Sequence, residues 1–161
     1  SLQDLLESFQ IRLMLEVPLV RKAAMIRTED DIKKLNKAYH NLQKAAESDD
    51  AKATLNADKE YHSELLKIAA IERALTIINN TRNTVLLSGP STIPHSRTCM
   101  QAFEDHQALH EAVLNGDANK AGEEMERHII NTARLLVTQE SSSRENWDDT
   151  NILEQFSWIH K

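Results

Sequence analysis

The sequence predicts an all-α fold, an antiparallel bundle of about six to seven helices. Only three glycines and three prolines occur in 161 residues, so residues that interrupt helices are rare. β-Branched residues nowhere alternate with polar ones over the length of a strand, whereas apolar residues recur at spacings of three and four. Rare breakers and a helical period together favour long helices joined by short turns.

Local signals start and stop six expected helices. Thr28, followed by acidic residues, is typical of an N-cap, and residues 48–50 form the next break. Residues 88–94 are rich in glycine and proline and form the clearest loop. Gly116 and Asp117 supply a C-cap glycine and a new N-cap. The expected helices cover residues 2–26, 29–46, 51–70 and 72–87, a segment that ends near 114, and residues 118–140.

The chain is expected to form one domain over residues 1–140, followed by a polar tail over residues 141–161. With 40% hydrophobic residues it can bury a sizeable core, and short connections make successive helices antiparallel neighbours. The tail opens with three serines. Its Trp147, Phe156 and Trp158 would allow it to dock as a short last helix.

Charge and composition exclude several functions. The formal net charge is −6 and no run of Lys or Arg occurs, so the chain is not expected to bind a nucleic-acid backbone by itself. No apolar run approaches the roughly 20 residues that span a bilayer. A single cysteine, Cys99, and the lack of a signal peptide favour a reducing cytoplasm. Because the chain begins in an amphipathic pattern without an initiator methionine, we expect a domain of a longer protein.

Two polar residues interrupt the apolar face of the third expected helix. In NADKEYHSELL, Asp58 and His62 lie on the same stripe as Leu55 and Leu65. Burying a lone carboxylate is costly, so Asp58 needs a partner. Side chains four residues apart converge, which is also how one helix chelates a metal ion.

Histidines replace aliphatic residues on the inner stripes of the last two expected helices as well. His106 lies ten residues before Gly116, and His128 lies eleven residues after Asp117. Each distance corresponds to about 15 Å along a helix. In an antiparallel hairpin the two imidazoles would therefore come level, beside Asp58 and His62.

Three imidazoles and one carboxylate suit a divalent ion such as Zn²⁺ or Ni²⁺, with Mn²⁺ a further candidate, and suit Ca²⁺ poorly. Any one of these histidines alone is more often a hydrogen-bonded core residue. Four inward polar positions at one level favour the metal. Of the other histidines, His110 is an alternative ligand one turn from His106, nearer the edge of the stripe. We expect the other three histidines, His40, His95 and His160, to lie on the surface or in loops.

Three segments resemble the FCD domain, the effector-binding C-terminal half of the FadR subfamily of GntR transcriptional regulators. DLLESFQIRLMLEVPLVRKAAM resembles its opening helix, and DKEYHSELL resembles its Asp-x-x-x-His helix. EDHQALHEAVLNGDANKAGEEMERHI is similar to its closing helical hairpin. The resemblance covers about residues 3–137. It implies a bundle with an internal cavity that holds a divalent metal, with the ligands Asp58, His62, His106 and His128.

The resemblance also implies partners. A winged-helix DNA-binding domain would precede Ser1, so that DNA is contacted through a domain outside this chain. A homodimer is implied, and six core helices suggest the smaller, VanR-like branch. The expected function is a ligand sensor whose effector modulates DNA binding.

The effector is expected to be a small carboxylate. An ion with four protein ligands keeps one or two positions, normally filled by water, that a carboxylate can take. Arg12 is the leading candidate for neutralising the remaining charge, because it lies between Phe9 and Glu16 and resembles the family's helix-one arginine. Arg82, with Asn83 beside it, is the second. Alternatively, Arg12 forms an internal ion pair with Glu16 one turn along the helix.

Three other functions stay open at this point. A metal-dependent hydrolase needs a general base near the metal-bound water, but helix geometry turns Glu60, Glu104 and Asp105 away from the inner stripe. We therefore expect no enzymatic activity. A purely structural metal could clip three helices together without any ligand. A plain helical interaction module would hold only a hydrogen-bonded polar cluster.

Overall fold

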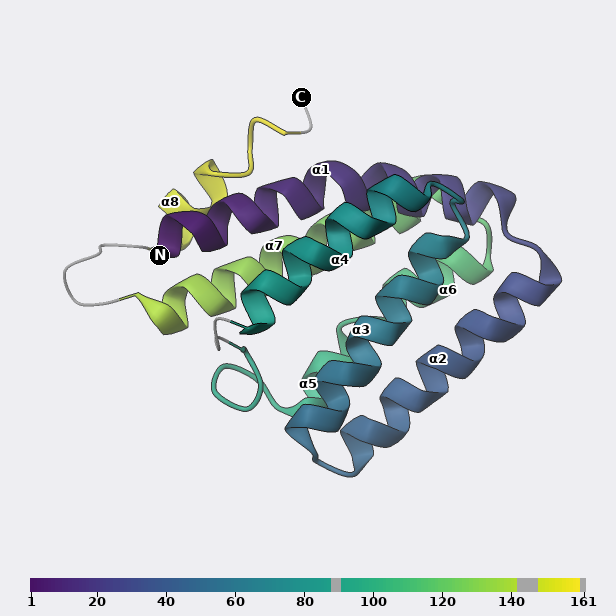
Figure 1. Ribbon diagram of the computed structural model, residues 1–161, viewed down its shortest axis with the longest axis horizontal. Helices are drawn as coiled ribbons and strands as arrows, with labels where there is room; N and C mark the ends of the chain where they lie inside the picture. The colour runs from purple at the N-terminus through teal and green to yellow at the C-terminus, as the bar shows by residue number, and fades with distance from the viewer. Residues whose placement is uncertain (88–90, 142–147, 160–161) are drawn as a thin grey trace.

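The computed structural model describes residues 1–87, 91–141 and 148–159, and these ranges fold into helices and their connections with no strand. The all-helical class is therefore confirmed (Figure 1). The eight helices in the described ranges are α1 (Leu2–Ile26), α2 (Glu29–Glu47), α3 (Ala51–Lys67), α4 (Glu72–Leu87), α5 (Cys99–Glu104), α6 (Gln107–Leu114), α7 (Ala118–Glu140) and α8 (Asp149–Glu154). None of these helices is both long enough and apolar enough to cross a membrane.

Polar caps begin the helices where the sequence predicts them. The Thr28 hydroxyl accepts a hydrogen bond from the Asp31 N–H at 3.1 Å, and the Asp31 carboxylate accepts from the Thr28 N–H at 2.9 Å. This reciprocal pair satisfies two backbone donors at the start of α2. Asp117 begins α7 by accepting from the Lys120 N–H at 3.0 Å. Gly116 ends the preceding turn with φ of +70°, a conformation that favours glycine.

The helix pair α1 and α7 forms one side of the bundle, and the pair α2 and α3 forms the other. α1 lies against α7 and α4, α2 and α3 form an antiparallel hairpin, and α6 contacts α7 (Figure 1). Gly122 lies where α7 meets the Arg21 side chain of α1. A Cβ atom at this position would lie 2.3 Å from Arg21 Nε, so a glycine lets the two helices approach closely.

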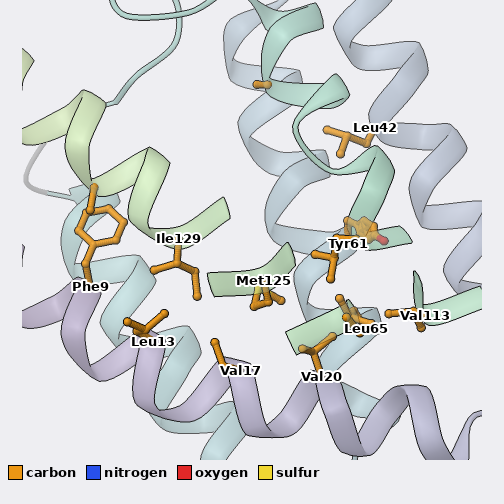
Figure 2. Close-up of a cluster of buried hydrophobic side chains, with 14 of the residues drawn as sticks. Phe9, Leu13, Val17, Val20, Leu42, Tyr61, Leu65, Val113, Met125 and Ile129 are labelled. Atoms are coloured by element: carbon orange, nitrogen blue, oxygen red, sulfur yellow. The ribbon is translucent and has the colours of Figure 1, made fainter. Parts of the chain in front are cut away.

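The core consists mainly of apolar side chains from α1, α2, α3, α6 and α7, and α5 and α8 add a few more (Figure 2). Val20, Leu65 and Met125 are fully buried. Burial of each such side chain stabilises the fold by about 1.5–3 kcal/mol. His62 lies three residues before Leu65, and His128 lies three residues after Met125. The packing that buries the apolar residues therefore also directs these imidazoles inward.

The helix expected to end near residue 114 is divided in two. The His106 N–H bonds to the Phe103 carbonyl at 3.0 Å, one residue short of the α-helical pattern, so the chain tightens between α5 and α6. In a regular helix, neighbouring side chains project about 100° apart. The tightened turn instead lets both Asp105 and His106 face the interior.

The turn between α3 and α4 also differs from the expectation. α3 ends at Lys67 rather than near residue 70, while α4 begins at Glu72 as predicted. Ala70 has a φ of +59°, which L-residues adopt at a cost. This left-handed residue reverses the chain direction.

The tail docks through fewer aromatic residues than expected. Ile152 and Phe156 are buried in the main core, and α8 contacts α7. Trp158 is 56% exposed, and its Nε1 donates to the Gln155 carbonyl at 2.8 Å. Trp147 lies outside the described residues. Among the described residues of the tail, Ile152 and Phe156 are buried, and the partly buried Ile159 packs beside them.

Candidate metal centre

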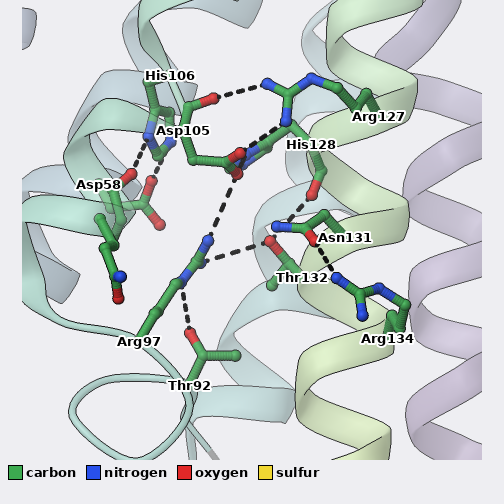
Figure 3. A network of polar contacts seen from close by, with 12 residues as sticks. Asp58, Thr92, Arg97, Asp105, His106, Arg127, His128, Asn131, Thr132 and Arg134 are labelled. Carbon is green, nitrogen blue, oxygen red and sulfur yellow. Dashed lines mark hydrogen bonds and ion pairs between the residues drawn. The ribbon is translucent and has the colours of Figure 1, made fainter.

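Four predicted ligands from three parts of the chain meet inside the bundle. Asp58 and His62 come from α3, His106 from the α5–α6 junction and His128 from α7. One potential ligand atom from each residue lies within 4.8 Å of all the others. The ring centroids of His106 and His128 are 4.4 Å apart, and the three imidazoles are buried. Figure 3 shows Asp58, His106 and His128 converging from different segments.

Each imidazole is oriented by an acceptor at its Nδ1 atom. The three acceptor contacts are His62 with Glu16 Oε1 at 3.1 Å, His106 with the Ala102 carbonyl at 2.7 Å, and His128 with Asp105 Oδ2 at 2.5 Å. A carbonyl or an ionised carboxylate can only accept, so each Nδ1 carries the proton. In the neutral form that binds metal ions, each imidazole then has a lone pair on its Nε2 atom.

These lone pairs face one another. His62 Nε2 and His106 Nε2 are 3.2 Å apart, and Asp58 Oδ1 lies 2.7 Å from His106 Nε2. Asp58 Oδ1 is buried and has no hydrogen-bond partner within the described chain. Acceptors that face one another without a proton are unfavourable in a buried site. A divalent ion would satisfy them all. Ligands about 2.1 Å from a metal lie roughly 3–4.2 Å apart, so the two imidazoles already have a suitable spacing, whereas the 2.7 Å contact of Asp58 would have to lengthen slightly.

Two further carboxylates surround the cluster. Burial opposes the ionisation of Glu16, but Arg12, whose Nε lies 2.7 Å from Glu16 Oε2, and His62 lower the pKa of Glu16 below its ordinary value. Burial likewise opposes the ionisation of Asp105, while His128 and Arg127 lower the pKa of Asp105. Both groups are therefore anions that accept hydrogen bonds.

His128 is suited to remain neutral, as metal ligation requires. Burial, together with the neighbouring His106, lowers the pKa of His128 to about 3, although the Asp105 contact acts in the opposite direction. A neutral His128 whose Nδ1–H is held by a carboxylate has its Nε2 free to coordinate.

Sequence reasoning missed the roles of Glu16 and Asp105. Glu16 interrupts the apolar stripe of α1 between Leu13 and Val20, which is the same signal that revealed Asp58. The prediction that Asp105 turns away from the interior is wrong. It assumed one continuous helix, and the tightened turn before His106 redirects the Asp105 side chain.

A cavity of about 70 Å³ adjoins the cluster. At roughly 10–15 Å³ per water-sized group, this space accepts about five to seven such groups. The polar lining comprises Arg12, Asp58, Ser91, Thr92, Arg82, Arg97, His128 and Thr132, and the apolar lining comprises Phe9, Leu55, Val85 and Leu136. Asn83 is not among these residues. The cavity and the proposed ligands Asp58 and His128 thus share one wall.

Three arginines reach this wall, and two of them were predicted. Arg12 lines the cavity and also pairs with Glu16. The internal ion pair that the sequence offered as an alternative role for Arg12 is therefore present as well. Arg82 Nη2 lies 3.1 Å from Asp58 Oδ2, while its buried Nε has no hydrogen-bond partner among the described residues. Arg97 was not predicted, because it lies in the irregular segment before α5, where no periodicity marks an inward face.

The remaining histidines lie elsewhere. His110 is buried away from the cluster, where its Nδ1 accepts from the Tyr61 hydroxyl and its Nε2 donates to Asn36 Oδ1, both at 2.8 Å. Its ring stacks on Tyr39, and burial lowers the pKa of His110 to about 4. These contacts occupy both nitrogens, which argues against His110 as a ligand. As for the other three, His40 and His95 are exposed, and His160 lies outside the described residues.

The FCD domain family model matches residues 7–131, so the chain belongs to the FCD domain family. This match confirms the resemblance found in the sequence. It identifies the chain as a ligand-sensing domain of the transcription-regulator type.

Two solved structures share the fold. Streptococcus agalactiae GntR aligns with a TM-score of 0.66 and 23% identity, over 82% of this chain and 58% of that chain. E. coli McbR/YncC aligns with a TM-score of 0.69 and 17% identity, over 83% of this chain and 67% of that chain. The chain thus spans about three fifths to two thirds of these structures. A comparison with curated protein sequences found no match.

Proposed function

We propose that the chain binds one divalent metal ion through Asp58, His62, His106 and His128. The observation that supports this proposal most strongly is that the Nε2 atoms of His62 and His106 lie only 3.2 Å apart while the Nδ1 atom of each ring faces an acceptor. Zn²⁺ and Ni²⁺ suit this nitrogen-rich set best, and Mn²⁺ suits it less well. The bound ion would supply Lewis acidity to a ligand in the adjoining cavity.

The proposed effector is a small organic acid. Its carboxylate would complete the coordination of the ion, while Arg12 and Arg82 provide positive charge at the cavity wall. Asn83, the third residue predicted for effector binding, would act only from outside the cavity lining. The small volume restricts the ligand to a few heavy atoms.

The domain would sense this acid on behalf of a transcription regulator. We propose that a winged-helix domain outside this chain binds DNA and that the regulator is a homodimer, as in the family. The cavity is lined by residues of α1, α3, α4 and α7 and of the segment before α5. A ligand that binds one arrangement of these helices better than another shifts the equilibrium toward it by its differential affinity.

The site is less well suited to a metallohydrolase. Glu60 and Glu104 are exposed and point away from the cluster. Asp105 contacts His128, Arg97 and Arg127, and the low pKa of Asp105 makes it a weak base. A purely structural metal would explain the ligands but not the adjoining cavity with its arginines.

Metal analysis followed by calorimetry tests the proposal. Protein purified without added metal, then loaded and dialysed, is expected to hold one ion per chain. His62→Ala and His128→Ala should lose the ion, whereas the exposed control His95→Ala should retain it. Titration with a panel of small organic acids should give heat only with the metal-loaded protein. Failure of Zn²⁺, Ni²⁺ and Mn²⁺ alike to bind contradicts the metal site, and a loaded protein that binds no acid contradicts the sensor.

A further inference from the structure

The charges around the cavity balance before any metal is counted. Each buried arginine has its own carboxylate partner: Arg12 pairs with Glu16 at 2.7 Å, Arg82 with Asp58 at 3.1 Å and Arg97 with Asp105 at 3.4 Å. Their side chains are 20% exposed or less. The three positive and three negative charges cancel, and an imidazole that coordinates an ion through Nε2 while its Nδ1–H is hydrogen-bonded adds no charge.

Surface charges do not alter this balance. Arg127 also contacts Asp105, but it is 47% exposed and pairs with Glu124 at 2.7 Å. Arg127 and Glu124 therefore form a second balanced pair at the edge of the site.

A divalent ion in the cluster would leave a buried excess of two positive charges. Uncompensated buried charge is strongly unfavourable, and a bound ion is the largest local charge in its site. Water would leave both charges uncompensated, and a monocarboxylate would leave one. A ligand with two negative charges restores neutrality.

Arg97 provides a second positive pole, separate from Arg82. It belongs to the segment before α5 and is held by Thr92 at 2.9 Å, with Asp105 and Thr132 each at 3.4 Å (Figure 3). The two 3.4 Å contacts are at the long limit for hydrogen bonds, so an incoming anion can replace them readily. Arg82 belongs to α4, and its buried Nε donor lacks a partner among the described residues.

We propose that the effector is a dicarboxylate of three or four carbons and that Arg97 determines this specificity. This inference rests on the proposed metal and effector site. One carboxylate binds the ion beside Arg82, and the second is bound by Arg97 with the hydroxyl of Thr92. The cavity volume of about 70 Å³ has room for the three-carbon acid, and the four-carbon acid fits if the carboxylate bound to the ion lies partly outside the cavity, beside the cluster.

Matched acids test the inference on the Zn²⁺-loaded chain by calorimetry. The pairs are malonate with propanoate and succinate with butanoate, which differ only in the second carboxylate. The better dicarboxylate is expected to bind at least about tenfold more tightly than its monocarboxylate partner, as loss of a charged hydrogen bond predicts. Metal content is measured before and after each titration, because dicarboxylates can also extract metal. Inorganic phosphate, whose charge lies on a single centre rather than on two separate groups, is expected to bind more weakly than the better dicarboxylate.

Variants assign the preference to Arg97. Arg97→Ala should abolish the dicarboxylate preference, and Arg97→Lys should retain part of it. The exposed control Arg73→Ala should retain all of it. Circular dichroism checks that each variant folds. If Arg97→Ala does not fold, the wild-type ratio and Arg97→Lys decide the question.

The outcomes separate this inference from the proposed function. Equal affinity for both members of each pair, a preference that survives Arg97→Ala in a folded protein, or phosphate as the tightest ligand overturns the inference while the sensor proposal stands. A metal-loaded chain that binds none of these anions overturns both.

Discussion

The three clustered imidazoles differ in the acceptor that fixes them. A backbone carbonyl holds His106, whereas carboxylates hold His62 and His128. A carboxylate partner makes the coordinating nitrogen more basic and restricts the rotation of the ring. Glu16 and Asp105 should therefore contribute to metal affinity although neither would touch the ion.

Glu16→Gln tests this contribution. Glutamine keeps the shape of the side chain but removes its charge, so we expect Zn²⁺ affinity to fall about tenfold or more in competition with a chelator. The melting temperature should fall too, because Arg12 loses the buried partner that lies 2.7 Å from its Nε.

The matched control is Glu7→Gln on the exposed face of the same helix. It should change neither quantity appreciably. Unchanged Zn²⁺ affinity in Glu16→Gln would mean that this carboxylate serves only Arg12.

Most of the residues in the cluster could be predicted from the sequence. Asp58, His62, His106 and His128 each interrupt an apolar helical stripe. Glu16 also interrupts one, but it was predicted only as an ion-pair partner of Arg12. Arg97 could not be found, because periodicity does not say which way an irregular segment faces. The metal-ligand role of the first four stays a prediction.

At the scale of the helices, the structure departs from the prediction mainly in the connections between them. α1 and α4 have the bounds that were predicted, because caps and apolar periodicity are local signals. The α3–α4 turn instead places Ala70 at a φ of +59°. Left-handed geometry costs an L-residue roughly 1–2 kcal/mol, and glycine avoids that cost.

Ala70→Gly should therefore stabilise the domain. The relief of backbone strain is partly offset by the greater freedom of glycine in the unfolded chain, about 0.4–1 kcal/mol, so a net gain of about 0.5–1 kcal/mol is expected. Urea denaturation measures it. The same exchange in a helix, Ala45→Gly in α2, should instead cost about 1 kcal/mol. Equal destabilisation by both changes would show that the left-handed turn is not strained.

Across the whole molecule, the proposed ion joins segments that are far apart in the sequence. Its ligands lie on α3, at the α5–α6 junction and on α7, so coordination would link both halves of the bundle. Folding creates the site, and the binding free energy of the ion therefore adds to the stability of the folded state.

Removal of the metal should lower the melting temperature. An ion present at 100 times its Kd adds about 2.7 kcal/mol, and one kcal/mol shifts a chain of this size by about 2–4 °C. Chelation is thus expected to lower the midpoint by about 5–10 °C in differential scanning calorimetry. Zn²⁺ should restore the midpoint, whereas Ca²⁺, which prefers oxygen ligands, should not. Identical melting curves with and without chelator would contradict a bound ion.

The sequence by itself determined the helical class, most helix bounds and the inward polar positions, because apolar periodicity and capping act within a few residues. Tertiary structure alone decided that Asp105 faces inward, that Arg97 lines the cavity and that His110 belongs to a separate network. Those outcomes depend on a tightened turn, an irregular segment and partners that lie 49 and 74 residues from His110. Packing between segments that are distant in the sequence determines these three outcomes, and a local sequence pattern does not reveal that packing.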